Sequence, residues 1–169
     1  MWNKPWNMKE GFLIGGGLIA TGLMLELSVG PVVWDAFSWP VNGIVLGTFL
    51  LMIAVFYVLR KHVYVLRFIS THHAAIPAMT YVVALTLVMG LTRQTVNGTW
   101  INNMLTFWPF VLTYIYIAVI LGVVTLRQLT AWWAQRSLLN VPYSLLSHLG
   151  LFIAMTTATL GNADMQRLR

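Results

Sequence analysis

One histidine lies inside a long apolar run of this sequence, and it offers the clearest chemistry. His148 follows Tyr143-Ser-Leu-Leu-Ser and precedes Leu149-Gly150. An ionisable side chain within a membrane-length apolar run is a candidate functional residue, because burying it in hydrocarbon is costly. A neutral imidazole can ligate haem iron or transfer a proton, and Gly150 leaves room for a flat macrocycle or a close helix. The alternative is a structural histidine that hydrogen-bonds to a neighbouring helix.

The other three histidines lie among basic residues. His62, His72 and His73 fall within or beside the segment RKHVYVLRFISTHHAA, residues 60–75. We expect them to be mainly solvated groups near lipid headgroups, with His72 and His73 as weaker candidates for a second iron ligand. A bis-histidine cytochrome b needs ligands on facing intramembrane helices, and His148 is the one intramembrane histidine. The sequence therefore disfavours a self-contained cytochrome.

The acidic residues and the missing motifs exclude several other chemistries. Glu26 lies at the outer end of an apolar run, where it could relay protons or bind a quinone, although we expect it to reach headgroup water. Asp35 and Asp164 are isolated, so paired-carboxylate hydrolysis has no support. The chain has no cysteine, no phosphate-binding loop, no zinc-protease motif and no nucleophile elbow. Thiol redox chemistry and conventional hydrolase or kinase activity are excluded.

The elements that position these residues follow from composition. Of 169 residues, 59% are hydrophobic and 8% are charged, whereas a soluble domain carries about a quarter charged residues. A helix needs about 20 apolar residues to cross a bilayer. We predict an all-α polytopic membrane bundle with five transmembrane helices: Phe12–Leu27, Val41–Leu59, Ile76–Leu91, Trp108–Leu126 and Val141–Leu160. All eight tryptophans lie at or outside the ends of these spans, as in interfacial aromatic belts.

Charge placement predicts the orientation of the spans. Seven of the ten Lys and Arg residues fall on the side of the N-terminus, and three fall on the other side. The positive-inside rule then places the N-terminus in the cytoplasm and the C-terminus outside. Topology and anionic lipid explain the net charge of +6, and no basic face with stacking aromatics indicates nucleic-acid binding.

Small residues and loops supply further expectations. Gly11 and Gly15, and likewise Gly16 and Ala20, have the spacing that lets a second helix approach closely. Residues 60–75 could extend the second span as an interfacial helix. The loop of residues 31–40 could form a short re-entrant or surface element. No repeat or linker is visible, so we expect a single transmembrane domain over residues 1–169.

The C-terminal residues carry a family resemblance. The stretch Leu145-Leu-Ser-His-Leu-Gly-Leu-Phe-Ile-Ala-Met155, followed by Gly161-Asn-Ala-Asp-Met-Gln-Arg-Leu168, resembles the ResB (CcsB) family of cytochrome c biogenesis proteins. The resemblance implies a bacterial inner (plasma) membrane protein that joins a CcsA-like partner, moves haem b across the membrane and serves apocytochrome c indirectly. It implies that His148 ligates haem iron in the cytoplasmic half of the membrane.

Two features depart from that family. Five spans are predicted where many members have three before their outer domain, and Arg169 falls where the large periplasmic domain would begin. We therefore expect the membrane portion alone, which would be a component of a haem lyase complex and not an enzyme by itself.

Three functions follow from these observations. The first is a haem-handling component of system II cytochrome c maturation. The alternative is a structural or anchoring subunit of a respiratory or transport complex, without its own cofactor. A third, a quinone or haem b oxidoreductase subunit, needs a second intramembrane ligand.

Overall fold

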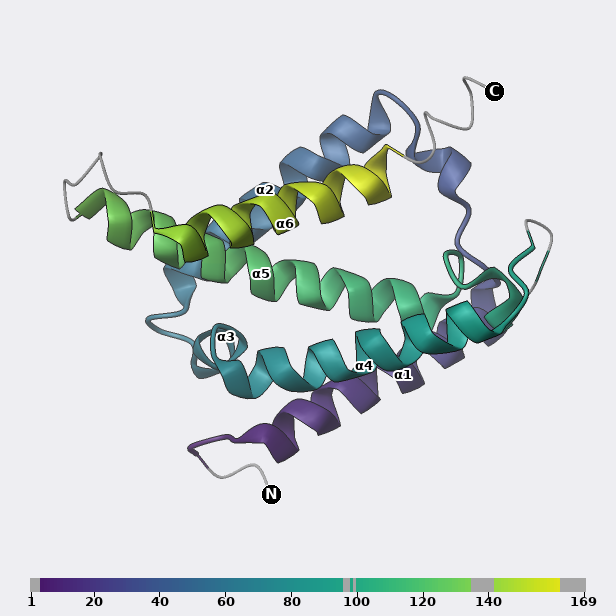
Figure 1. The fold of residues 1–169 in the computed structure, drawn as a ribbon, viewed down its shortest axis with the longest axis horizontal. Coiled ribbons are helices and arrows are strands. Elements are labelled where there is room, and N and C mark those ends of the chain that lie inside the picture. The colour runs from purple at the N-terminus through teal and green to yellow at the C-terminus, as the bar shows by residue number, and fades with distance from the viewer. Residues whose placement is uncertain (1–3, 96–97, 99, 135–141, 162–169) are drawn as a thin grey trace. The chain divides into compact units, whose positions relative to one another are not determined.

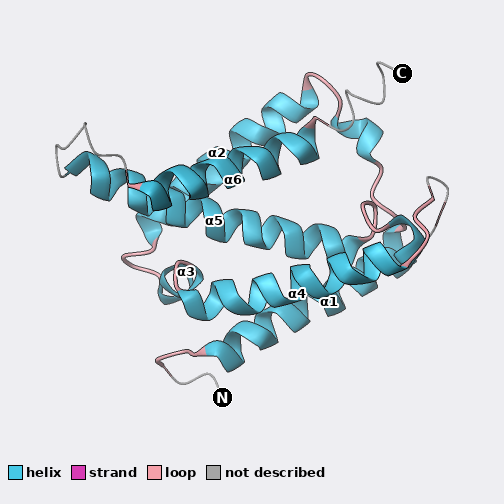
Figure 2. Cartoon of the chain, viewed as in Figure 1, coloured by secondary structure: helices cyan, strands magenta, loops and turns pink. Residues whose placement is uncertain are grey.

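The computed structural model describes residues 4–95, 98, 100–134 and 142–161, and these residues are almost entirely helical (Figure 2). Helix accounts for 81% of them, and none lies in a strand. Five helices are long and apolar enough to cross a membrane, which confirms the predicted fold class. They are α1 (Met8–Val29), α2 (Val41–Leu59), α4 (His72–Leu91), α5 (Trp108–Ala134) and α6 (Tyr143–Leu160). The shorter elements are η1 (Trp34–Phe37), α3 (Tyr64–Ile69) and η2 (Trp100–Asn103).

The chain divides into two compact units, which we describe separately. Unit 1 consists of residues 1–33 and 71–117, and unit 2 consists of residues 34–70 and 118–169. Helix α5 contributes its first part to unit 1 and its second part to unit 2. It buries 56% of its apolar window, whereas the other four long helices bury 6–17% of theirs. Those four helices therefore present mainly apolar side chains outward, as lipid contact requires.

Local sequence explains where the spans differ from their predicted limits. Helix α2 matches its prediction, but α1 begins four residues earlier because Asn7 and Glu10 form a capping box. The Lys9 amide donates to Asn7 Oδ1, and the Asn7 amide donates to Glu10 Oε2, each over 2.9 Å. Helix α4 begins at its first histidine, α5 continues to Ala134, and α6 is described from Tyr143, so Val141 lies outside the described residues.

In unit 1, helices α1 and α4 lie side by side, and glycines on α1 form the contact (Figure 1). A Cβ atom built on Gly11 would lie 2.3 Å from the carbonyl oxygen of His73, and one on Gly15 would lie 2.4 Å from the ring of Tyr81. The Tyr81 hydroxyl donates to the Phe12 carbonyl over 3.0 Å. The predicted close helix approach is therefore confirmed for Gly11 and Gly15.

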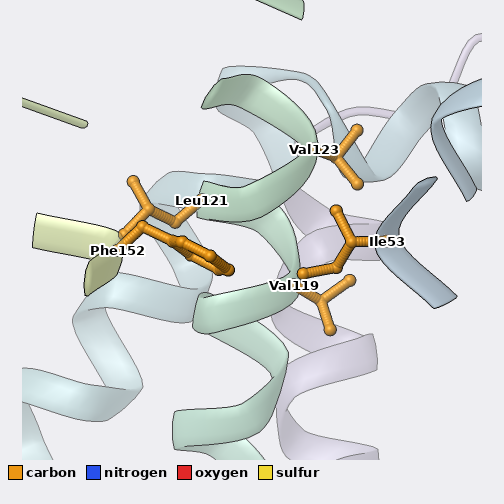
Figure 3. Packing of buried hydrophobic residues seen from close by; sticks show 5 residues of the cluster. All are labelled: Ile53, Val119, Leu121, Val123 and Phe152. Carbon is orange, nitrogen blue, oxygen red and sulfur yellow. The ribbon is translucent and has the colours of Figure 1, made fainter. Parts of the chain in front are cut away.

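In unit 2, helices α2 and α6 pack with the second part of α5 around an apolar cluster (Figure 3). Val119 and Val123 of α5 point toward Ile53 of α2, while Leu121 lies beside Phe152 of α6. The Phe152 ring stacks on Phe49 with ring centroids 6.3 Å apart. Ile69 of α3 also packs against this cluster, whose buried members come from α2, α5 and α6.

Polar contacts define the helix directions in unit 2. The Tyr57 and Thr130 hydroxyls form a hydrogen bond. Tyr57 follows Ile53 in α2, and Thr130 follows the α5 residues that Ile53 contacts, so α2 and α5 run parallel. The Asn42 amide donates to the Leu160 carbonyl over 3.4 Å, which joins the first residues of α2 to the last of α6. Helix α6 therefore runs antiparallel to its two neighbours, as consecutive membrane spans require.

The connections of unit 2 partly correct the sequence predictions. Residues 60–75 do not extend α2, because α2 ends at Leu59 and a turn leads into the separate helix α3. The amides of His62 and Val63 both donate to the Leu59 carbonyl, which closes that turn. The expected short element in the first loop is present as η1.

Candidate functional site

The His148 side chain is oriented by its own helix. Its Nδ1 lies 2.5 Å from the carbonyl oxygen of Ser144, one turn earlier in α6. Because a carbonyl oxygen only accepts, Nδ1 carries a proton in this contact, and in the neutral form of the ring the lone pair then lies on Nε2. No hydrogen bond engages Nε2 within the part of the chain that the structure describes. A backbone bond of this kind fixes the tautomer in the way that metal-ligating histidines require.

His148 lies on the face of α6 that meets the rest of unit 2. Leu145, three residues earlier, and Phe152, four residues later, share this face and are 3% and 9% exposed. A Cβ atom on Gly122 of α5 would lie 3.0 Å from the Phe152 ring, so this face is turned toward α5. His148 itself is half-buried. The imidazole is thus held at the edge of the packed core of unit 2.

Gly150 lies two residues after His148, about 200° further around α6, so it is on the outer face of the helix and not on the face that carries the imidazole. A Cβ atom on Gly150 would meet no other atom within 4 Å. Ser147 does not compete for the imidazole, since its hydroxyl bonds to the carbonyls of Tyr143 and Ser144. The open space at Gly150 therefore does not provide room beside the imidazole, and the expectation that it would accommodate a macrocycle at His148 stays a prediction.

The two adjacent histidines form a pair in unit 1. His72 and His73 occupy the first turn of α4, with ring centroids 4.0 Å apart and planes tilted by 43°. His72 is exposed, whereas Nδ1 of His73 is buried and lacks a hydrogen-bond partner among the described residues. Both histidines belong to α4 and not to a loop; the exposed side chain of His72 agrees with the expectation of a solvated group, whereas His73 is half-buried. The structure brings these two histidines together, while His148 belongs to unit 2.

Glu26 differs from its prediction. Its side chain is 7% exposed, so it does not reach headgroup water. Its Oε2 accepts the backbone N–H of Trp108 over 3.2 Å, at the first residue of α5. The Trp108 indole in turn donates to the Gly30 carbonyl over 2.7 Å. Glu26 therefore caps a helix N-terminus, where a carboxylate satisfies a free N–H and interacts favourably with the helix dipole.

Two buried polar residues of α5 were not predicted from the sequence. The Tyr116 hydroxyl and Gln128 Oε1, both on α5, are buried and lack hydrogen-bond partners in the described part of the chain, as does Nδ1 of His73. The signal was available, because polar residues inside an apolar run attract attention by the same argument as His148. Among the described residues, no group of three or more His, Cys, Asp or Glu side chains is arranged to hold a metal ion.

Comparison with known proteins identifies no relative. The chain matches no family model, no curated protein and no solved structure. The resemblance of residues 145–168 to the ResB family stays a prediction from the sequence, and its second part, residues 162–168, lies outside the described residues.

Proposed function

We propose that this chain is a haem-handling membrane component of system II cytochrome c maturation, acting with a CcsA-like partner. The observation that carries the proposal is the hydrogen bond from His148 Nδ1 to the Ser144 carbonyl, which in the neutral form of the imidazole leaves the lone pair on Nε2 available to a metal. When bound, haem supplies an iron that accepts an axial imidazole ligand. The residues of α6 fit one imidazole contact to such an iron, because His148 lies on the inward face of the helix and its Nδ1 is bonded to the Ser144 carbonyl.

The described residues of unit 2 support one intramembrane ligand. The other histidine of this unit, His62, lies in the turn after α2 and is exposed. A second protein ligand to the haem iron would therefore come from the partner. In this arrangement His148 holds and orients the cofactor, and the bond to apocytochrome forms on the partner at the outer surface.

The test is the visible spectrum of the purified chain. We expect the chain coexpressed with a CcsA-like protein to show a reduced-minus-oxidised haem b spectrum, and His148→Ala to lose it. The matched control is His62→Ala, an exposed histidine of the same unit, which should keep the wild-type spectrum. Added imidazole should restore part of the haem signal in His148→Ala, since it replaces the missing ligand.

A second function is favoured by one observation. The buried bond of Glu26 to the first residue of α5 is an interhelical structural contact, as expected of an anchoring subunit without a cofactor. Absence of haem from the wild-type chain, both alone and with the partner, would support this function over haem handling.

A further inference from the structure

Four cationic side chains gather at one end of unit 2: Arg60, Lys61, Arg67 and Arg127, which we call the basic rim. The guanidinium carbon of Arg60 lies 4.2 Å from the ring centroid of Tyr57, and that of Arg67 lies 5.5 Å from the centroid of Tyr64. Stacking on an aromatic face restrains a guanidinium while leaving its in-plane N–H groups available. These arginines are therefore oriented by the protein and are not merely dispersed in solvent.

Helix α3 brings the remaining arginine into the same group. Arg127 of α5 donates from Nη1 to the Ser70 carbonyl over 3.2 Å. The Ser70 amide and hydroxyl both donate to the Arg67 carbonyl, over 3.3 and 2.8 Å. The Arg127 guanidinium thus lies at the C-terminal end of the short helix that carries Arg67. Arg60 and Lys61 lie in the turn that leads into this helix.

Nothing in the described part of unit 2 neutralises the basic rim. Among the described residues of unit 2, Asp35 in η1 is the one carboxylate. The whole of α2 lies between η1 and Arg60 along the chain. A helix of 19 residues is about 28 Å long, which is far beyond the range of an ion pair. A guanidinium has five N–H donors, and Arg127 uses one of its N–H-bearing nitrogens in the contact with Ser70. The remaining donors favour an anionic oxygen ligand.

Exposed apolar side chains lie directly beside these cations. Val58 and Leu59 precede Arg60 and are 63% and 40% exposed, and Val63 and Val65 flank the start of α3 at 40% and 42%. A free anion would gain nothing from this surface. An occupant with an anionic head and long apolar chains would satisfy both parts of it.

We infer that the basic rim binds the phosphate of an anionic phospholipid, with the acyl chains lying along the exposed apolar residues of α2 and α3. Basic groups at a helix end beside apolar surface have the chemistry that recognises anionic headgroups, and arginine is well suited to phosphate because its fork donates two parallel hydrogen bonds. Lipid binding here does not depend on the proposed haem ligand.

The test is native mass spectrometry of the full chain in mild detergent, titrated with phosphatidylglycerol or phosphatidylcholine. We expect phosphatidylglycerol to be retained preferentially, and Arg67→Gln with Arg127→Gln to weaken its retention by about 10- to 30-fold. The matched control, Lys9→Gln with Arg93→Gln, removes the same charge from exposed residues of unit 1 and should retain lipid as the wild type does.

Three outcomes would overturn the inference. Equal weakening in the control pair would show that only the net charge of the chain matters. Equal retention of phosphatidylcholine would show that the anionic headgroup is not recognised. Displacement of the lipid by millimolar inorganic phosphate would show that the basic rim binds a free anion.

Should the double variant unfold, Arg127→Lys replaces it, because this change keeps the charge but removes the planar guanidinium. Unchanged phosphatidylglycerol binding in Arg127→Lys would overturn the role of Arg127. His148→Ala should retain the lipid whether or not the haem proposal holds.

Discussion

The two units pack their helices by different means. In unit 1 two glycine contacts of α1 are limited by backbone: Gly11 faces the carbonyl oxygen of His73, and a Cβ atom on Gly22 would lie 2.6 Å from the Pro109 backbone. The contact of Gly15 is limited by the Tyr81 ring. In unit 2 the contact at Gly122 is limited by the ends of side chains, with Ile53 Cδ1 at 2.6 Å and the Phe152 ring at 3.0 Å from a Cβ atom built there. A side-chain end can change its rotamer, whereas backbone in a packed helix cannot move without shifting the whole element.

The polar contacts follow the same division. The end of unit 1 where α1 meets α5 is fixed by Glu26 and by bonds among loop residues: Gln94 donates to the Ile101 carbonyl over 2.9 Å and accepts the Met104 amide over 2.9 Å. The core of unit 2 is apolar, and polar bonds join its helices near their ends, from Asn42 to the Leu160 carbonyl and between Tyr57 and Thr130. We therefore expect unit 1 to tolerate substitution at its helix contacts less well than unit 2.

The largest expected effect comes from a methyl group in unit 1. Gly11→Ala places an atom against the His73 carbonyl and the Pro77 ring, so α1 and α4 must separate. We expect the free energy of unfolding to fall by about 3 kcal/mol. Gly17→Ala is the control on the same helix, because a Cβ atom there meets nothing within 4 Å. Equal unfolding midpoints for the two variants in detergent would contradict the backbone contact.

The next effect concerns the cap of α5. Glu26→Leu leaves the Trp108 N–H buried without its acceptor, and we expect a loss of about 2 kcal/mol in unfolding free energy. Glu26→Gln keeps a carbonyl acceptor at the same place and should lose about half as much. The comparison is made by denaturant titration of both variants. Similar stability of the leucine variant and the wild type would show that the carboxylate does not cap the helix.

The smallest effect is expected in unit 2. Gly122→Ala meets the tip of Ile53 and the edge of Phe152, which can shift, so we expect a loss of about 1 kcal/mol. Adding Ile53→Val removes the Cδ1 atom that obstructs the new methyl group and should recover part of the loss. A double-mutant cycle measures this recovery. A loss as large as that of Gly11→Ala would remove the distinction between the units.

The spans could be predicted from the sequence because hydropathy depends on each segment alone. The limits of α2 follow from hydropathy, and the glycine contacts of α1 follow from the spacing of small residues within that segment. The start of α1 was also within reach, since Asn7 followed three residues later by Glu10 is a capping-box pattern. The helical position of His72 and His73 was missed because basic neighbours indicated a loop, whereas the apolar run beginning at Ala74 extends the helix back to them.

Glu26 shows what the sequence could not supply. Its partner, Trp108, is 82 residues away, and nothing near Glu26 indicates that a helix begins beside it. The orientation of the His148 ring has a local cause, the Ser144 carbonyl, but the sequence does not say which ring nitrogen bonds to it. Residue types at a site were therefore predictable, while pairings over long separations and ring orientation required coordinates.

The contact between Gly11 and Pro77 also bears on how this sequence can vary. Pro77 has no N–H, so it cannot donate to the His73 carbonyl one turn earlier, and that oxygen is turned toward Gly11. A larger residue at position 11 would be tolerated only with a change on α4 that withdraws the carbonyl or the ring. Positions 11 and 77 are thus expected to change together in related chains, so that a substitution at one is found with a compensating substitution at the other.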